Sequence, residues 1–246
     1  MATFDQARLK INRASQHIVE AERRIKLVVG PEGQTSRIEI HPEARAKSVR
    51  YRLLKLGELP EIALVIGDAI HNLKTALDYA WLQVITASIP RMAGERPKFP
   101  IYPTVDLLEQ FLTNKKIHID CPRLSRFVFN IKPYDGGNFY LYPLHQMDIV
   151  DKHRLLIPST TYGNVEGLTV KDHSGAVTGR TWGSELAEEF HVDFHQDIEI
   201  QDKGRVAFEI VFKEGPMKDM EVTGLLGGFS CTVLALVELM EKFVQP

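Results

Sequence analysis

The sequence predicts an α+β fold with a helical core, a small antiparallel sheet and a C-terminal helix that returns to the core. Apolar residues recur at helical spacing through the first 160 residues, alternate at strand spacing over residues 192–212, and run almost uninterrupted near the end. We therefore expect a helical core over residues 1–160, an antiparallel β subdomain over 161–222 and a C-terminal helix over 223–246. These parts form either separate units or one single domain.

The first element is predicted to be a long helix with a narrow apolar seam. Its apolar residues follow 3,4 spacing for almost four heptads, and its alanines allow a partner helix to approach closely. The seam consists of Phe4, Ala7, Ile11, Ala14, Ile18, Ala21, Ile25 and Val28. The Gly- and Pro-containing segment 30–33 ends this helix. A short strand or turn is expected at residues 37–40, followed by a basic amphipathic piece over 43–56.

Three further helices are expected before residue 160. A second long helix covers residues 61–88, because Pro60 suits a first helical turn and Pro90 follows the last one. A shorter helix covers residues 106–115. A third core helix starts at Pro143 and ends near Leu156.

The later part of the chain predicts strands and one last helix. Apolar and polar residues alternate over 192–200 and again over 206–212, and Asp202-Lys203-Gly204 between them is typical of a hairpin turn. Segments 168–171 and 176–182 are candidates for further strands. The stretch 225–244 is apolar on nearly every face, so we expect it to be buried in the core or in a subunit interface.

Composition indicates a soluble globular protein. The chain of 246 residues is 44% hydrophobic and 25% charged, with a formal net charge of −2, which excludes a general electrostatic nucleic-acid binder. The charge is unevenly distributed. Residues 1–60 carry 12 Lys/Arg against 7 Asp/Glu, a net +5, and residues 181–225 carry 4 against 11, a net −7. The basic part suits an anionic ligand or nucleic acid, or the two parts attract each other.

The cysteines and the N-terminus predict a cytoplasmic location. Cys121 and Cys231 are far apart and lack metal-type spacing, which fits a reducing compartment. The N-terminal residues lack the apolar region of a signal peptide. The longest apolar run, over 225–237, is too short to span a bilayer, so we expect no membrane association.

The candidate site lies in two polar strings set in apolar helical stretches. The first runs from His71 to Asp78, and the second runs from His145 to Arg154. The candidate catalytic residues are His71, Asp78, Asp151 and His153, and the candidate phosphate- or ligand-binding residues are Lys152 and Arg154. We expect the second and third core helices to pack together and to bring Asp78 close to segment 151–154.

These strings support two functions of different class. In the first, buried ion pairs and hydrogen bonds make a structural network in a binding or assembly module. In this case His153 is a buried, satisfied residue. In the second, the protein is a metal-independent nuclease or other hydrolase. His71 or His153 is then the general base, Asp78 or Asp151 orients it, and Lys152 and Arg154 hold a phosphate.

A rival set of polar residues lies near the acidic strands. Five His and carboxylate side chains alternate over residues 191–199, which predicts one strand face bearing His191, Asp193, His195, Asp197 and Glu199. Such residues can bind zinc or a harder metal, but same-face neighbours are about 7 Å apart, so a solvent-facing sheet surface is the preferred interpretation. Phosphate-loop, dinucleotide-binding and zinc-protease motifs do not occur, and we expect no metal or cofactor.

The polar strings carry a resemblance to a family. Segment 66–78 followed by Trp81, together with 98–101, 131–134 and 148–154, resembles a pattern of bacterial hypothetical proteins, HNLxxALD…FPI…PY…DxxDKHR. The resemblance implies no particular activity. A looser resemblance is to the helical HEPN ribonucleases, whose Arg and His are four to six residues apart. The candidate pairs Arg13/His17 and Arg37/His41 are spaced too closely for that motif.

Two apolar surfaces predict a homodimer. The seam over 4–28 is about 37 Å long at about 1.5 Å per residue, which is more than a small core covers. The C-terminal helix also needs cover on nearly all sides. The alternative is an intramolecular antiparallel bundle in which these two helices cover each other.

Overall fold

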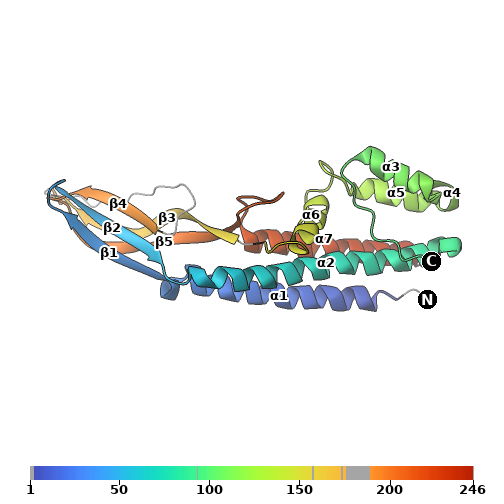
Figure 1. Ribbon diagram of the computed structural model, residues 1–246, viewed down its shortest axis with the longest axis horizontal. Helices are drawn as coiled ribbons and strands as arrows, with labels where there is room; N and C mark the ends of the chain where they lie inside the picture. Colours follow the sequence, from blue (N-terminus) through green and yellow to red (C-terminus); the bar gives the residue numbers. More distant parts are fainter. Residues whose placement is uncertain (1–2, 93, 157, 173, 176–188, 246) are drawn as a thin grey trace.

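The protein is elongated, with helices at one end and strands at the other (Figure 1). The computed structural model describes residues 3–92, 94–156, 158–172, 174–175 and 189–245. Its helices and two antiparallel sheets confirm the predicted α+β fold. Both ends of the chain lie at the helical end, far from the strands (Figure 1).

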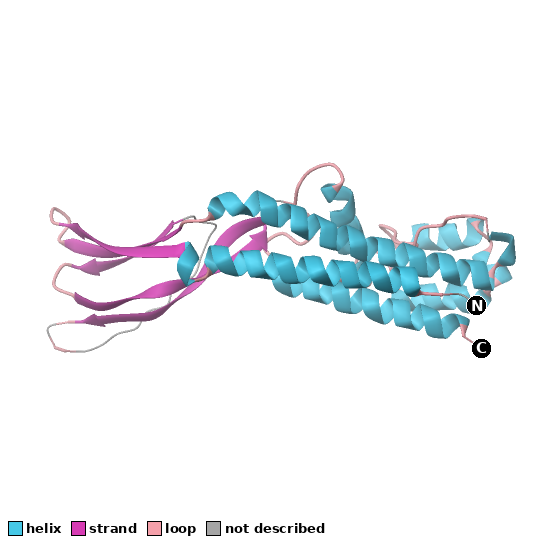
Figure 2. Ribbon diagram, turned by 90° about the horizontal axis from the view of Figure 1, so that it is seen from below, coloured by secondary structure: helices cyan, strands magenta, loops and turns pink. Residues whose placement is uncertain are grey.

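Three long helices run side by side and form the main bundle (Figure 2). They are α1 (Asp5–Val29), α2 (Leu59–Ser88) and α7 (Val222–Val244). The predicted seam of α1 is at most 7% exposed, because α2 and α7 cover it within the same chain. This is the arrangement of the intramolecular alternative, so the seam no longer argues for a second copy. The N-terminus of α7 is capped by Glu221, whose carboxylate accepts hydrogen bonds from the backbone N–H groups of Thr223 and Gly224 at 2.8 and 2.6 Å.

Four shorter helices lie along one side of the bundle. Helices α3 (Val105–Asn114), α4 (Ile117–Asp120) and α5 (Pro122–Ile131) group beside its terminal end, and α6 (Leu141–Asp151) lies over the middle of α2 (Figure 1). Helix α3 was predicted, whereas α4 and α5 were not. The predicted third core helix, α6, ends at Asp151 rather than near Leu156.

The strands form two small sheets around a second core. One sheet has the order β1 (Gln34–His41), β2 (Ala46–Leu53), β4 (Glu189–His195), and the other pairs β3 (Pro158–Lys171) with β5 (Glu199–Phe212). All these pairings are antiparallel. Apolar side chains from both sheets cluster between them: Val49, Tyr51, Leu53, Val165, Leu168, Val170, Phe190, Val192, Val206 and Phe208.

Two sequence-based expectations about the strands need correction. The basic amphipathic piece over 43–56 is mostly strand β2, in which Val49 and Tyr51 face the second core. The predicted hairpin at Asp202-Lys203-Gly204 does not form, because β5 continues through it and pairs with β3. Gly204 has φ +61° there, and a Cβ would lie 2.4 Å from the carbonyl oxygen of Glu166. The turn-type residues therefore mark a local irregularity in a long strand. The candidate strand over 176–182 lies outside the described residues.

Candidate functional site

The two polar strings face each other where α6 packs on α2. His71 on α2 lies 3.0 Å from Asp148 on α6, measured from Nδ1 to Oδ1. The other carboxylate oxygen of Asp148 accepts a hydrogen bond from Lys152, one turn further along α6. Asp148 is only 3% exposed, so a charge there needs these partners. The pair joins the two helices and confirms that the strings meet.

Helix α6 crosses α2 steeply, with its C-terminal end against the N-terminal half of α2 (Figure 1). Asp151, at the C-terminal end of α6, lies against Gly67, where an added Cβ would come within 2.2 Å of its carboxylate. His145, at the other end, shares a cavity with Lys74. The glycine therefore permits the close approach of the helices. The pKa of Asp151 is raised, mainly by burial and then by the nearby charges of Asp148 and Asp68.

Because Asp151 lies against Gly67, Asp78 is separated from segment 151–154, contrary to the sequence-based expectation. Asp78 lies eleven residues beyond Gly67, or about 16 Å along the axis of α2 at 1.5 Å per residue. Its carboxylate Oδ1 instead accepts hydrogen bonds from Nζ of Lys74 at 2.5 Å and from the backbone N–H of Phe99 at 2.8 Å. Asp78 thus ties the segment before α3 to α2.

His153 and Arg154 lie on the surface, past the end of α6. The side chain of His153 is exposed, so the expectation of a buried and satisfied histidine is wrong. Arg154 lies 3.3 Å from the carboxylate of Glu214, and both of these side chains are largely exposed. The structure therefore brings together His71, Asp148 and Lys152, and leaves His153 and Arg154 outside this cluster.

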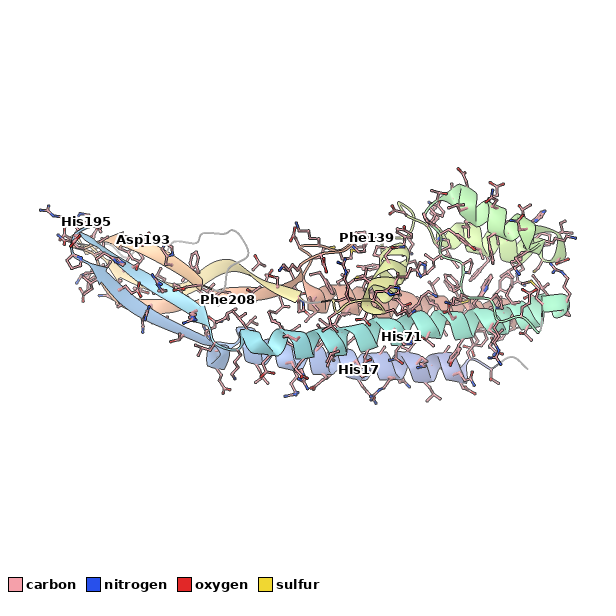
Figure 3. The ribbon with its side chains drawn as sticks, viewed as in Figure 1. His17, His71, Phe139, Asp193, His195 and Phe208 are labelled. Atoms are coloured by element: carbon pink, nitrogen blue, oxygen red, sulfur yellow. The ribbon has the colours of Figure 1, made fainter. Side chains whose placement is uncertain are left out.

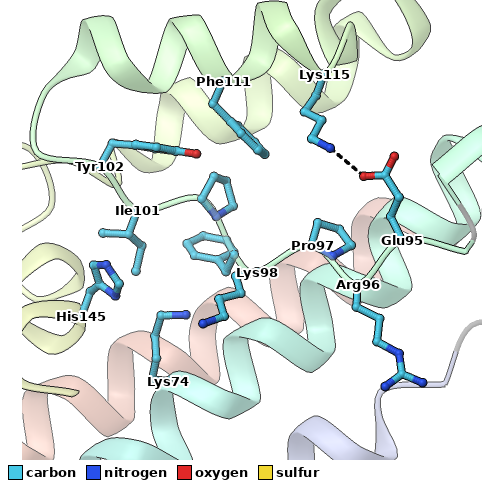
Figure 4. Close-up of a pocket in the computed structure, with 12 residues that line it drawn as sticks. Lys74, Glu95, Arg96, Pro97, Lys98, Ile101, Tyr102, Phe111, Lys115 and His145 are labelled. Atoms are coloured by element: carbon cyan, nitrogen blue, oxygen red, sulfur yellow. Dashed lines mark hydrogen bonds and ion pairs between the residues drawn. The ribbon is translucent and has the colours of Figure 1, made fainter. Parts of the chain in front are cut away.

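A cavity of about 550 Å³ opens between α2, α3, α6 and the segment over 95–102 (Figure 4). Its lining is strongly basic, with a single carboxylate. The lining residues are Lys74, Glu95, Arg96, Pro97, Lys98, Phe99, Pro100, Ile101, Tyr102, Phe111, Lys115 and His145. Glu95 is neutralised by Lys115 at 2.8 Å. Of the other basic groups, Lys74 is paired with Asp78, whereas Lys98 has no carboxylate partner among the described residues.

His145 and Lys74 are the least exposed basic groups of this cavity. Lys74 is 4% exposed and is held by Asp78. His145 Nδ1 is buried and has no hydrogen-bond partner among the described residues. The pKa of His145 is lowered, mainly by burial and then by the positive charge of Lys74, so the ring favours its neutral form. Neither residue was among the sequence candidates, although both belong to the polar strings.

Lys98 and Arg96 complete the basic lining and could not be found from helical spacing. They belong to an irregular segment that α2 holds through Asp78 and the backbone of Phe99. One sequence feature could have indicated Lys98: the segment Lys98-Phe99-Pro100-Ile101 is part of the pattern that carries the family resemblance. Figure 4 shows Lys74 and Lys98 pointing into the same end of the cavity.

The rival histidine and carboxylate set lies at the strand tip, far from His71 in the middle part of the molecule (Figure 3). Strand β4 ends at His195 and the chain then turns, so the five side chains do not share one strand face. Two exposed pairs form instead, His191–Asp193 at 3.7 Å and His195–Asp197 at 3.0 Å. Within the described ranges, no group of three or more His, Cys, Asp or Glu residues is arranged to hold a metal ion.

Helix α7 is the one described helix that is long and apolar enough, by composition, to cross a membrane. Such a helix is also typical of a protein core, and one face of α7 is buried against α1 and α2 through Leu226, Phe229, Val233 and Val237.

Comparison of the chain with protein-family models, with curated proteins and with solved structures returned no match. The site is therefore interpreted from its own chemistry.

Proposed function

We propose that this protein binds a small anionic ligand in the cavity between α2, α6 and the segment over 95–102. The observation that carries the proposal is the lining, which combines five basic side chains with one carboxylate. In the described part of the chain, no carboxylate pairs with Lys98, and Figure 4 shows its ammonium directed to the same end of the cavity as that of Lys74, so its charge is available to a ligand. Charge-assisted hydrogen bonds from such groups are the usual means of holding phosphate or carboxylate.

The network at His71 supports binding by holding the cavity wall in place. Asp148 connects His71 of α2 to Lys152 of α6, and His145 lies one turn before Asp148 on the same helix. Fixing α6 therefore fixes the position of the His145 ring. These contacts support the structural network that the sequence suggested.

Calorimetric titration with inorganic phosphate tests the proposal. We expect binding at low salt that weakens as salt rises, and Lys98→Gln should weaken it about tenfold, as expected for loss of one charge-assisted hydrogen bond. The matched control is Lys213→Gln, because Lys213 is exposed and does not line the cavity. Equal loss in both variants, or no phosphate binding by the wild-type protein, would contradict the proposal.

A metal-independent hydrolase is the second candidate, and one observation favours it. Asp148 orients the Nδ1 side of His71, while the imidazole is half exposed and its Nε2 lies 3.5 Å from the hydroxyl of Thr75. This arrangement suits a general base oriented by a carboxylate, with Asp148 in the role that the sequence assigned to Asp78 or Asp151. Hydrolysis of RNA or of an aryl phosphate ester in the presence of a chelator, abolished by His71→Ala, would favour this candidate.

The homodimer stays a prediction, and it now rests on exposed side chains of α7 alone. The seam of α1 is covered within the chain, but α7 keeps exposed Cys231, Leu234 and Leu239. Light scattering at several protein concentrations checks it. A concentration-independent mass near 27.9 kDa would contradict a dimer.

A further inference from the structure

We propose that the ligand of the basic cavity is amphipathic, with an anionic head and a flat aromatic body, as in an aryl phosphate. This inference rests on the proposed function and specifies its ligand class. It follows from the way in which charged and apolar side chains are separated along the cavity wall.

One end of the cavity is suited to the anionic head. Lys74, Lys98 and His145 line this end, and Lys74 and Lys98 point toward one place (Figure 4). Lys74 is held in position by Asp78, so little side-chain freedom is lost when it binds an anion. The ring of His145 also lines this end, while its Nδ1 is buried and has no partner among the described residues.

The other end is suited to an aromatic body. Tyr102 and Phe111 line it, with ring centroids 5.5 Å apart and an interplanar angle of 37°. Both rings are only partly buried, so they present apolar area to the cavity. Burial raises the pKa of Tyr102, which keeps its hydroxyl neutral and adds no negative charge to repel an anion. Flat apolar groups bind such rings by stacking or edge contacts.

The size of the cavity also exceeds what a bare anion needs. At about 550 Å³ it falls in the range of sites for small organic molecules, about 300–1,000 Å³. Inorganic phosphate would leave the aromatic end filled by water. An aryl group attached to the phosphate would displace that water and bury the exposed parts of Tyr102 and Phe111.

The test compares three probes by calorimetry: phenyl phosphate, inorganic phosphate and phenol. We expect phenyl phosphate to bind at least tenfold more tightly than inorganic phosphate, and phenol to bind far more weakly than phenyl phosphate. Phe111→Leu should reduce the advantage of phenyl phosphate over inorganic phosphate at least threefold. Lys98→Gln should weaken both phosphates. Circular dichroism and melting temperature verify that each variant folds.

The test has a matched control variant, and its outcomes distinguish failure of this inference from failure of the proposed function. Phe139→Leu changes an exposed phenylalanine that does not line the cavity, and it should alter no affinity. Equal affinities for phenyl phosphate and inorganic phosphate would overturn this inference and leave the proposed function intact. If neither phosphate binds the wild-type protein, both fail. Equal binding of phenol and phenyl phosphate would overturn the anionic head, and with it both proposals.

Discussion

Two histidine–aspartate pairs, one in the helical bundle and one at the strand tip, have the same nitrogen–oxygen distance and different surroundings. His71 and Asp148 join α2 to α6, and His195 and Asp197 lie beside the turn between β4 and β5; in both pairs the Nδ1–carboxylate distance is 3.0 Å. The Asp148 side chain is 4% exposed, whereas that of Asp197 is 49% exposed. Water competes with the second pair and screens it, so only the first can contribute much to stability.

The comparison teaches that burial, rather than residue type, separates the two polar clusters. The acidic strand region holds five histidine and carboxylate groups at alternate positions, yet its pairs are solvated. In the α2–α6 region Asp148 and Lys74 are buried, and Lys74 and His145 line a cavity. Each substitution in the helical region has a control substitution at the strand tip.

The largest expected effect is on Asp78. Asp78→Ala should lower the free energy of unfolding by about 3–5 kcal/mol, because it leaves the ammonium of Lys74 buried without its carboxylate and removes the acceptor of the Phe99 N–H. Urea denaturation measures it. The control Asp193→Ala, at the exposed tip, should stay within about 0.5 kcal/mol. A loss below about 1 kcal/mol for Asp78→Ala would contradict the importance of burial.

The matched histidine pairs give a more direct comparison. Asp148→Asn should cost about 1–3 kcal/mol, since a buried acceptor of two hydrogen bonds loses its charge. Asp197→Asn, with the same partner type at the same distance, should cost less than about 0.5 kcal/mol. Chemical denaturation of both variants under identical conditions decides the matter. Similar losses would show that the exposed pair is as strong as the buried one.

Ligand affinity should depend on pH through His145. Its pKa is lowered by burial and by Lys74, while Asp78 and Asp148 raise it and Lys152 lowers it. A bound anion favours the protonated ring, so phosphate affinity should rise as the pH falls from 7 toward and below the ordinary histidine value of 6.5. Calorimetry in two buffers of different ionisation enthalpy should detect proton uptake on binding.

His145→Gln should abolish this proton uptake, whereas His195→Gln at the far tip should leave it unchanged. The tip histidine pairs with Asp197 and does not line the cavity, so it serves as the control. Phosphate can also take up a proton through its own second ionisation. The proton uptake of the wild-type protein must therefore exceed that of the His145→Gln variant. Equal uptake in both proteins would assign the pH dependence to a group other than His145.

The smallest effect concerns Asp151. Its raised pKa means that the folded protein holds this proton more tightly than the unfolded chain does. The penalty for ionising Asp151 is absent below the unfolded value of 3.8 and grows as the pH rises through the raised folded value. Asp151→Asn should therefore be more stable than the wild type at neutral pH, and this gain should disappear below pH 3.8. Asp193→Asn should show no such pH-dependent gain, and thermal melts across this range compare the two.

Helical elements were predictable because their signals are local. The seam from Phe4 to Val28 and the apolar face of α2 follow from 3,4 spacing, and both are buried as expected. Strand pairing was less predictable, because a strand's partner is chosen by contacts far away in the chain. Turn residues 202–204 predicted a hairpin, yet β5 pairs with β3 while β4 pairs with β2.

The candidate site was predictable only in part for the same reason. The polar strings of α2 and α6 could be identified, and their contact could be expected because charges near apolar surface need partners. The direction in which α6 crosses α2 was not encoded locally, so Asp78 was matched with segment 151–154 and His153 was placed in the core. Lys98 joins the site through a segment whose position depends on Asp78.

The sequence by itself determined which helix faces are apolar and where the polar strings stand along them, because both follow from spacing within a single element. Only the tertiary structure decided which charges lose contact with water. Asp148 and Lys74 are buried because other elements cover them, whereas Asp197 in a similar local pattern stays solvated. The contribution of a charged side chain to stability depends on how far it is buried from water. The residues that bury it are distant in the chain.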